Sequence, residues 1–209
     1  MSSGTSLVVA KKKSTLPVSS AIDSNNESLP PLDYSYLKIT NLTDIYDETP
    51  RPAVLQKKAI VPVREDGKSG SRCLRLNNNA LVDIKLLSEI CTNLFDNPSV
   101  LGWLDLSFNE LVGIDQIVCE FEGLEILYLH GNQINNIGEV EKLQSLKNLR
   151  KLTLHGNPVE NVKGYRHHIL ALMPWLQNFD FSAVTKADRR TAENWEKMNK
   201  TPKKKKKEM

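Results

Sequence analysis

The chain has 209 residues and a formal net charge of +3, and 40% of its residues are hydrophobic and 25% are charged. These proportions fit one globular domain with some additional polar sequence. No stretch approaches the roughly 20 apolar residues that a membrane-spanning helix needs, and residues 1–20 contain no apolar run typical of a signal peptide. We therefore expect a cytoplasmic chain without a membrane span.

The charge is unevenly distributed along the chain. Residues 186–209 hold 10 Lys/Arg and 4 Asp/Glu, which gives +6 and leaves −3 for residues 1–185. We expect the run Lys203–Lys207 to be a solvated tail. The alternatives are a nuclear-localisation signal, a nucleic-acid patch, or a contact with an acidic surface such as the tails of tubulin. Because the run contains no aromatic residues and the rest of the chain is acidic, we expect no nucleic-acid partner.

The three cysteines, Cys73, Cys91 and Cys119, show no metal-binding or disulfide pattern. Their number is odd and no C-x-x-C spacing occurs, which favours buried thiols in a reducing compartment.

Four segments of the chain follow one template, L-x-L-x-x-N-x-(L/I/V)-x-x-(I/V). They start at Leu74, Leu104, Leu127 and Leu152, and their asparagines are 30, 23 and 25 residues apart. A regular repeat of about 20–29 residues with this pattern indicates leucine-rich repeats. The predicted fold is an α/β solenoid, a short right-handed horseshoe with parallel strands on its concave face.

The repeat pattern has a direct physical basis. In each L-x-L strand the leucines point inward and stack on those of the next repeat, so stability comes from neighbouring repeats. The asparagine stands where the chain leaves the strand, and its amide can satisfy backbone groups of adjacent turns. We expect such a ladder from the four template asparagines, namely Asn79, Asn109, Asn132 and Asn157.

Flanking segments divide the rest of the chain. Residues 1–30 are polar and predicted to be disordered, 31–70 form an N-terminal segment or cap with a linker, and the repeats span 71–162. The longer first step contains a helical pattern between residues 84 and 95. Residues 163–199 are predicted to be a C-terminal cap, in which Phe179 and Phe181 face the core, followed by a polar helix. Residues 200–209 form a basic disordered tail.

Several stretches carry a more specific likeness. They are P-P-L-D-Y-S-Y at 30–36, W-L-D-L-S-F-N-E-L at 103–111, L-T-L-H-G-N-P at 152–158 and F-D-F-S-A-V-T-K-A-D at 179–188. Over roughly residues 30–200 the chain resembles the family of leucine-rich repeat-containing protein 51, which implies a cytoplasmic, non-catalytic protein. Similar short-repeat proteins occur among phosphatase regulators and ciliary axoneme components.

The outward positions of the strands form the candidate partner-binding surface. Because neighbouring strands lie about 4.8 Å apart, equivalent positions should touch. Trp103, Ile126 and Tyr128 would form an exposed apolar cluster, unless the segment 31–60 covers Trp103. The predicted partner-binding residues are Trp103, Asp105, Ser107, Ile126, Tyr128, His130, Lys151, Thr153 and His155.

The histidines could in principle carry chemistry. His130 and His155 occupy equivalent positions, which suggests a metal pair or a pH switch, but zinc usually needs three or four protein ligands. We therefore expect no metal and no cofactor. His167-His168 is read as the solvated face of a cap helix, and Asp180 as a residue that closes the cap by hydrogen bonding.

Motifs of catalysis are missing from the sequence. It contains no G-x-S-x-G elbow, no phosphate-binding loop and no dinucleotide fingerprint. The sequence therefore predicts a monomeric, non-catalytic scaffold that binds another protein and no small-molecule substrate. The alternatives are a regulatory subunit of an enzyme such as a phosphatase, or a structural component of the ciliary axoneme.

Overall fold

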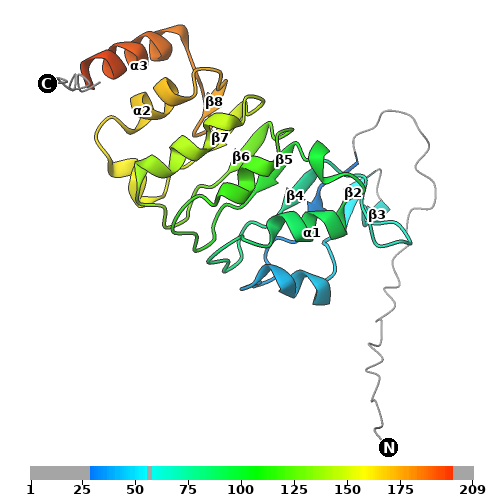
Figure 1. The fold of residues 1–209 in the computed structure, drawn as a ribbon. Helices are drawn as coiled ribbons and strands as arrows, with labels where there is room; N and C mark the ends of the chain where they lie inside the picture. The colour runs from blue at the N-terminus through cyan, green and yellow to red at the C-terminus, as the bar shows by residue number, and fades with distance from the viewer. Residues whose placement is uncertain (1–28, 56–57, 200–209) are drawn as a thin grey trace, which may run out of the picture.

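The computed structural model describes residues 29–55 and 58–199 of the chain, and in that part seven strands form one sheet. The sheet order is β1-β4-β5-β6-β7-β8-β9, and every neighbouring pair is parallel except β8 and β9. The strands follow one another in chain order (Figure 1), which confirms the predicted leucine-rich-repeat solenoid. Their bounds are β1 Leu32–Asp33, β4 Cys73–Arg75, β5 Trp103–Asp105, β6 Ile126–Tyr128, β7 Lys151–Thr153, β8 Asn178–Phe179 and β9 Ser182–Ala183.

Strands β2 (Ala53–Leu55) and β3 (Lys58–Ile60) form a separate antiparallel hairpin beside the N-terminal end of the sheet (Figure 1). The predicted disordered tails, including Lys203–Lys207, lie outside the described residues apart from Leu29 and Pro30. No helix of the described ranges is long and apolar enough to cross a membrane.

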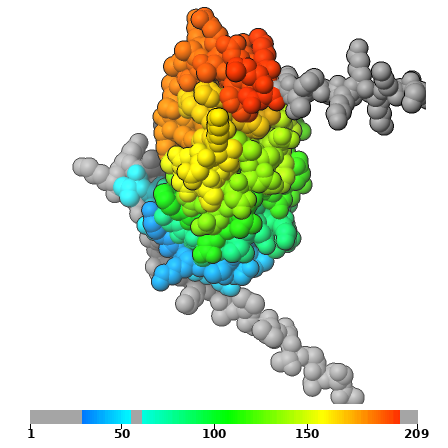
Figure 2. All heavy atoms as spheres, turned by 90° about the vertical axis from the view of Figure 1, so that its left-hand side faces the viewer, coloured from blue at the N-terminus to red at the C-terminus, as the bar shows by residue number. Residues whose placement is uncertain are grey.

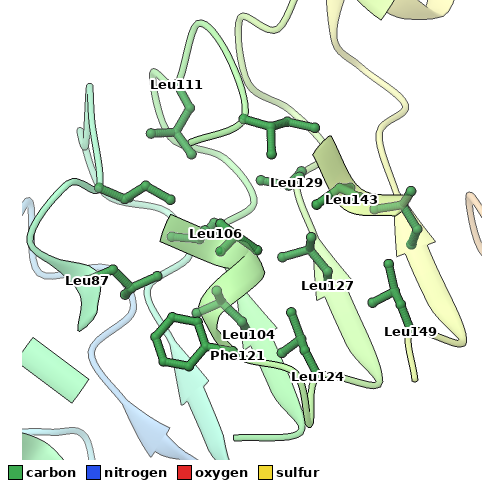
Figure 3. Close-up of a cluster of buried hydrophobic side chains, with 14 of the residues drawn as sticks. Leu87, Leu104, Leu106, Leu111, Phe121, Leu124, Leu127, Leu129, Leu143 and Leu149 are labelled. Carbon is green, nitrogen blue, oxygen red and sulfur yellow. The ribbon is translucent and has the colours of Figure 1, made fainter. Parts of the chain in front are cut away.

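The core is a stack of inward-pointing side chains from successive strands. In the observed register each first leucine of the template pairs with its equivalent in the next strand, from Leu74 through Leu104 and Leu127 to Leu152. All four are at most 1% exposed, and burying one leucine stabilises a fold by about 1.5–3 kcal/mol. Figure 3 shows Leu104 and Leu127 packed side by side within this stack.

The length of each repeat decides which helix covers the core. The first step, of 30 residues, contains the α-helix α1 (Leu87–Leu94), whose apolar face is buried. The two shorter steps, of 23 and 25 residues, contain 3-10 helices instead, namely η3 Gln116–Glu120 and η4 Ile137–Ser145, which have fewer residues per turn than an α-helix. Two further 3-10 turns are η2 Pro98–Val100, which follows α1 in the first step, and η5 Pro158–Asn161, which follows the last template asparagine.

The template asparagines join neighbouring turns of the solenoid. Asn132 Nδ2 donates to the carbonyls of Leu106 (3.0 Å) and Leu129 (2.9 Å), and its Oδ1 accepts from Leu111 N (3.1 Å). Asn109 and Asn157 repeat this pattern one turn earlier and one turn later. The side chain therefore supplies both the donors and the acceptor that the buried turns need.

The N-terminal segment adds a further turn to the solenoid. Residues 32–42 fit the repeat template with Tyr34 in place of the second leucine and Leu37 in place of the asparagine. Strand β1 pairs in parallel with β4, and Asn79 Oδ1 accepts from the backbone N–H groups of Leu37 (3.0 Å) and Ile39 (3.2 Å). The 3-10 helix η1 (Leu42–Asp47) follows and buries Leu42 and Ile45.

Two helices close the opposite end of the solenoid (Figure 1), and their residues, orange to red in Figure 2, lie at the end away from the blue N-terminal segment. Helix α2 (Tyr165–Leu172) packs under α3 (Lys186–Asn199), and Arg166 of α2 pairs with Asp188 of α3. A Cβ atom at Gly164 would lie 2.6 Å from Trp195 Nε1, and the backbone there has φ +79°, so glycine is required for this contact. Backbone hydrogen bonding from Thr185, together with Arg166, holds the pKa of Asp188 far below its usual range.

Candidate protein-binding surface on the concave face

The strand register places the predicted partner-binding residues on one face. Trp103 pairs with Ile126 and Ile126 with Lys151, while Asp105 pairs with Tyr128 and Tyr128 with Thr153. Around them the structure gathers six ring-bearing side chains, which we call the concave aromatic surface. Its members are Trp103, Phe108, Tyr128, His130, His155 and Phe181.

Exposure divides the predicted residues into two groups. Trp103, Ile126, Tyr128 and His155 are partly exposed and Lys151 is exposed, so a partner can reach them. The others are almost inaccessible, namely Asp105 at 6%, Ser107 at 2%, His130 at 9% and Thr153 at 2%. The expectation that these four lie open on the surface is wrong, because hydrogen bonds among neighbouring side chains and the rings above them close this part of the face.

Phe181 packs on three other rings of the surface, those of Tyr128, His130 and His155. The expectation that its side chain faces the core beside Phe179 is wrong, because the ring is 61% exposed. Asp180 and Phe181 both have positive φ, +48° and +58°, and form the two-residue turn between β8 and β9. Such a turn reverses the chain, so side chains no longer alternate between the two faces of the sheet as they do along a strand. The ring of Phe181 therefore packs against Tyr128 and His130, with ring centroids 5.4 Å apart in each case.

Asp180 fixes this turn by hydrogen bonding. Its Oδ1 accepts from Leu154 N (2.7 Å) and His155 N (3.0 Å), and Tyr165 Oη donates to its Oδ2 (2.9 Å). Burial, and then the negative charge of Asp180, raise the pKa of Tyr165 far above its usual range, so the phenol remains a donor. Three hydrogen bonds to Asp180 therefore hold the turn that carries Phe181.

His130 and His155 form a stacked pair within the surface. Their rings lie 4.7 Å apart and are inclined by 10°, and His130 Nδ1 is 2.8 Å from Thr153 Oγ1. Burial, followed by the charge of His155, lowers the pKa of His130. Parallel stacked rings do not converge on one point, and the described residues contain no group of three or more His, Cys, Asp or Glu that could hold a metal ion.

The remaining rings extend the surface on either side of the stacked pair. Trp103 packs edge-on against Tyr128 at 5.9 Å, and its Nε1 has no acceptor among the described residues. Phe108 is 52% exposed, packs on His130 at 5.1 Å and has φ +52°, which is unfavourable for a bulky residue. Sequence reasoning missed Phe108, although it stands where the next two repeats have glycine, Gly131 and Gly156.

Most charged side chains on this face are held by contacts within the chain. Arg75 Nη1 donates to Asp33 Oδ2 (3.0 Å), and Asp105 Oδ1 accepts from Ser107 Oγ (2.6 Å) and Ser107 N (3.1 Å). Lys151, in contrast, is exposed and forms no ion pair with any described residue. The face thus presents apolar rings beside the exposed ammonium group of Lys151.

Comparison with known proteins agrees with this architecture. A family model described as "Leucine-rich repeat" matches residues 101–209. The chain is 48% identical over 175 residues to "Leucine-rich repeat-containing protein 51" of Macaca mulatta, which covers 84% of this chain and 89% of the relative. It is 49% identical over 177 residues to the protein of the same name from Bos taurus, with the same two coverages.

A likeness to a solved structure concerns the fold alone. The chain matches the crystal structure of the Drosophila melanogaster SNF/U2A' complex with a TM-score of 0.55 and 21% sequence identity. The match covers 82% of this chain and 88% of that chain.

Proposed function

The chain belongs to the leucine-rich repeat-containing protein 51 family, and on that premise we propose that it is a non-catalytic module that binds another protein through its concave aromatic surface. Leucine-rich repeats form a rigid curved sheet, so side chains on the strands keep fixed positions. A rigid face with exposed aromatic rings can bind a partner without first ordering its own loops.

The observation that carries this proposal is the exposure of Phe181 beside Tyr128 and Trp103. Exposed aromatic rings are typical anchors of protein interfaces, where they supply large buried area at small cost in conformational entropy. Phe181 is 61% exposed although it is held in a backbone conformation that few aromatic residues adopt. A strained backbone at an exposed ring supports a functional role.

The polar groups of the same face support a binding role over a catalytic one. Asp105 and Asp180 already accept two and three hydrogen bonds, and His130 bonds to Thr153. Catalysis needs a nucleophile or base that can reach a substrate atom. Groups that are saturated by their neighbours are instead suited to fixing the shape of the surface.

A binding experiment with matched variants tests the proposal. Full-length wild type and Tyr128→Ala/Phe181→Ala are each captured from cells after brief cross-linking, and the cross-linked residues are mapped by mass spectrometry. Val112→Ser serves as the control, since Val112 is 67% exposed on the loop that follows Asn109. We expect cross-links around the aromatic rings that the double variant loses and the control retains; partners captured equally by all three proteins would refute the proposal.

The narrower features of this function remain predictions. They are a monomeric state, a cytoplasmic location, and a role as a regulatory subunit or an axonemal component. Each would follow from the identity of the cross-linked partner and from the mass of the free protein in solution.

A further inference from the structure

We propose that the concave aromatic surface binds an amphipathic α-helix of its partner, with apolar side chains on one face of the helix and a carboxylate beside Lys151. The inference rests on the proposed function and names the class of partner segment that fits the surface. It follows from three properties of the face: its saturated backbone, the spacing of its rings and the exposed charge of Lys151.

The saturated backbone favours a helical partner. In the middle of the sheet the peptide groups pair with the neighbouring strand, as in Leu106 N to Tyr128 O (2.9 Å) and Leu129 N to Thr153 O (3.0 Å). An extended segment lying on this face would find no backbone donors or acceptors there, and its own would be shielded from water. A helix satisfies its peptide groups internally, so only its side chains need complementary contacts.

The spacing of the rings matches one face of a helix. Trp103 on β5 contacts Tyr128 on β6, and Tyr128 contacts Phe181, which also contacts His155 just beyond the end of β7. Neighbouring strands are about 4.8 Å apart, and successive turns of an α-helix rise about 5.4 Å. A helix that crosses the strands therefore offers one apolar side chain per strand, at positions i, i+3 or i+4, and i+7.

The exposed charge of Lys151 beside the rings favours a helix that carries an acidic residue on its flank. Among the described residues of this face, Asp33, Asp105 and Asp180 accept hydrogen bonds from their neighbours. Lys151 pairs in the register with the partly exposed Ile126 and Asn178 and forms no ion pair within the described part of the chain. A carboxylate on the flank of the bound helix would pair with this ammonium group, whereas a lysine there would be repelled.

A selection experiment tests the inference directly. A phage-displayed library of random 16-residue peptides is selected on the immobilised full-length chain and counter-selected on Tyr128→Ala/Phe181→Ala. The dissociation constant of the best synthetic peptide is then measured for wild type, Phe181→Ala, Lys151→Glu and the control Val112→Ser. Circular dichroism of the peptide, free and bound, reports whether it is helical.

We expect enriched peptides with apolar residues at i, i+3 or i+4, and i+7, with Asp or Glu on one flank, that become helical on binding. Phe181→Ala should weaken binding roughly tenfold because it removes a central ring. Lys151→Glu should weaken it about threefold, as expected for an exposed ion pair, and a peptide with Lys in place of its acidic residue should recover that loss. Val112→Ser should have no effect.

Other outcomes overturn the inference in recognisable ways. Extended or Pro-rich peptides, or peptides with basic flanks, that still require Tyr128 and Phe181 would refute the acidic helix but leave the proposed binding function standing. Peptides that bind independently of both rings would refute both.

Two outcomes would show that the occupant of the surface is this chain itself and not a partner helix. A dimer in sedimentation experiments that Phe181→Ala dissociates would identify a second copy as the occupant. Tighter peptide binding after removal of residues 1–28 would identify the chain's own N-terminal segment.

Discussion

Equivalent backbone N–H groups find different acceptors in the interior of the sheet and at its last turn. In the interior, Leu129 N and Gly131 N donate to the carbonyls of Thr153 and His155 on the next repeat, both at 3.0 Å. At the end, the equivalent Leu154 N and Gly156 N donate to side-chain carboxylates, those of Asp180 and Glu160, both at 2.7 Å.

This difference shows how a short solenoid can end without unpaired backbone groups. The two carboxylates occupy the places that carbonyls of a further strand would fill, so no further repeat is needed. The chain is then free to reverse at Asp180 and Phe181, and the reversal places the ring of Phe181 on the concave face. One turn thus closes the sheet and completes the concave aromatic surface.

The largest effect is expected from breaking the interior ladder. Asn132→Leu leaves the buried N–H of Leu111 and the carbonyls of Leu106 and Leu129 without their partner, so the free energy of unfolding should fall by about 3 kcal/mol or more. Urea unfolding measures this loss. Asn135→Leu is the control, since Asn135 is exposed and outside the ladder, and its effect should stay within about 0.5 kcal/mol; equal losses would contradict the ladder.

A smaller effect is expected at the last turn. Asp180→Ala removes the acceptor of two backbone N–H groups and of Tyr165 Oη, which should cost about 2 kcal/mol and also weaken partner binding through Phe181. Asp180→Asn retains one acceptor oxygen and should lose less in both urea unfolding and binding. If Asp180→Ala is less stable than wild type but binds the partner with full affinity, the turn that closes the sheet is not coupled to partner binding.

The histidines should make stability depend on pH. Burial lowers the pKa of His130, with a further contribution from His155, and burial also lowers the pKa of His168. The unfolded chain, with histidine pKa values near 6.5, therefore takes up protons first, so the free energy of unfolding is highest above about pH 6.5 and falls as pH is lowered through the folded-state pKa values. Urea unfolding between about pH 6.5 and 5 should show this fall.

The matched variant for this pH dependence is His130→Asn/His168→Asn. It lacks both histidines with lowered pKa values, so its unfolding free energy should change less over the same interval. If the unfolding free energy of this variant depends on pH as steeply as that of wild type, neither histidine is the source of the pH dependence.

The smallest effect on stability is expected at Phe108. Phe108→Asn removes the ring contact with His130 but places at φ +52° a residue that tolerates this conformation, as Asn78 does at the equivalent position with φ +57°. The free energy of unfolding should therefore change by less than about 0.5 kcal/mol, while affinity for the partner falls. A large loss of stability would mean that Phe108 is a structural residue, as the ladder asparagines are.

The repeat pattern made most of the fold predictable. The positions of Leu74, Leu104, Leu127 and Leu152 fixed the four central strands and their register, because only one alignment buries all of the leucines at once. Residues 32–42, which form the additional turn at the N-terminal end of the sheet, follow the same template. Tyr34 and Leu37, however, stand in place of its second leucine and its asparagine. A template that allowed any large apolar residue at those two positions would have found it.

The candidate site was predictable only in part. The register placed Trp103, Ile126 and Tyr128 together, as expected from the alternation of the strands. The exposure of Phe181 was not predictable, because it depends on a turn whose conformation is set by hydrogen bonds of Asp180 with Leu154, His155 and Tyr165 from other parts of the chain.

The sequence by itself determined the repeat, the stacking of the leucines and the family, because these depend on periodic local patterns. Only the tertiary structure decided which side chains of the concave face are open to a partner. The physical reason is that the burial of Thr153 and His130 depends on contacts between adjacent repeats, and the exposure of Phe181 depends on a reversed turn held by Asp180. The periodicity of a single repeat predicts neither.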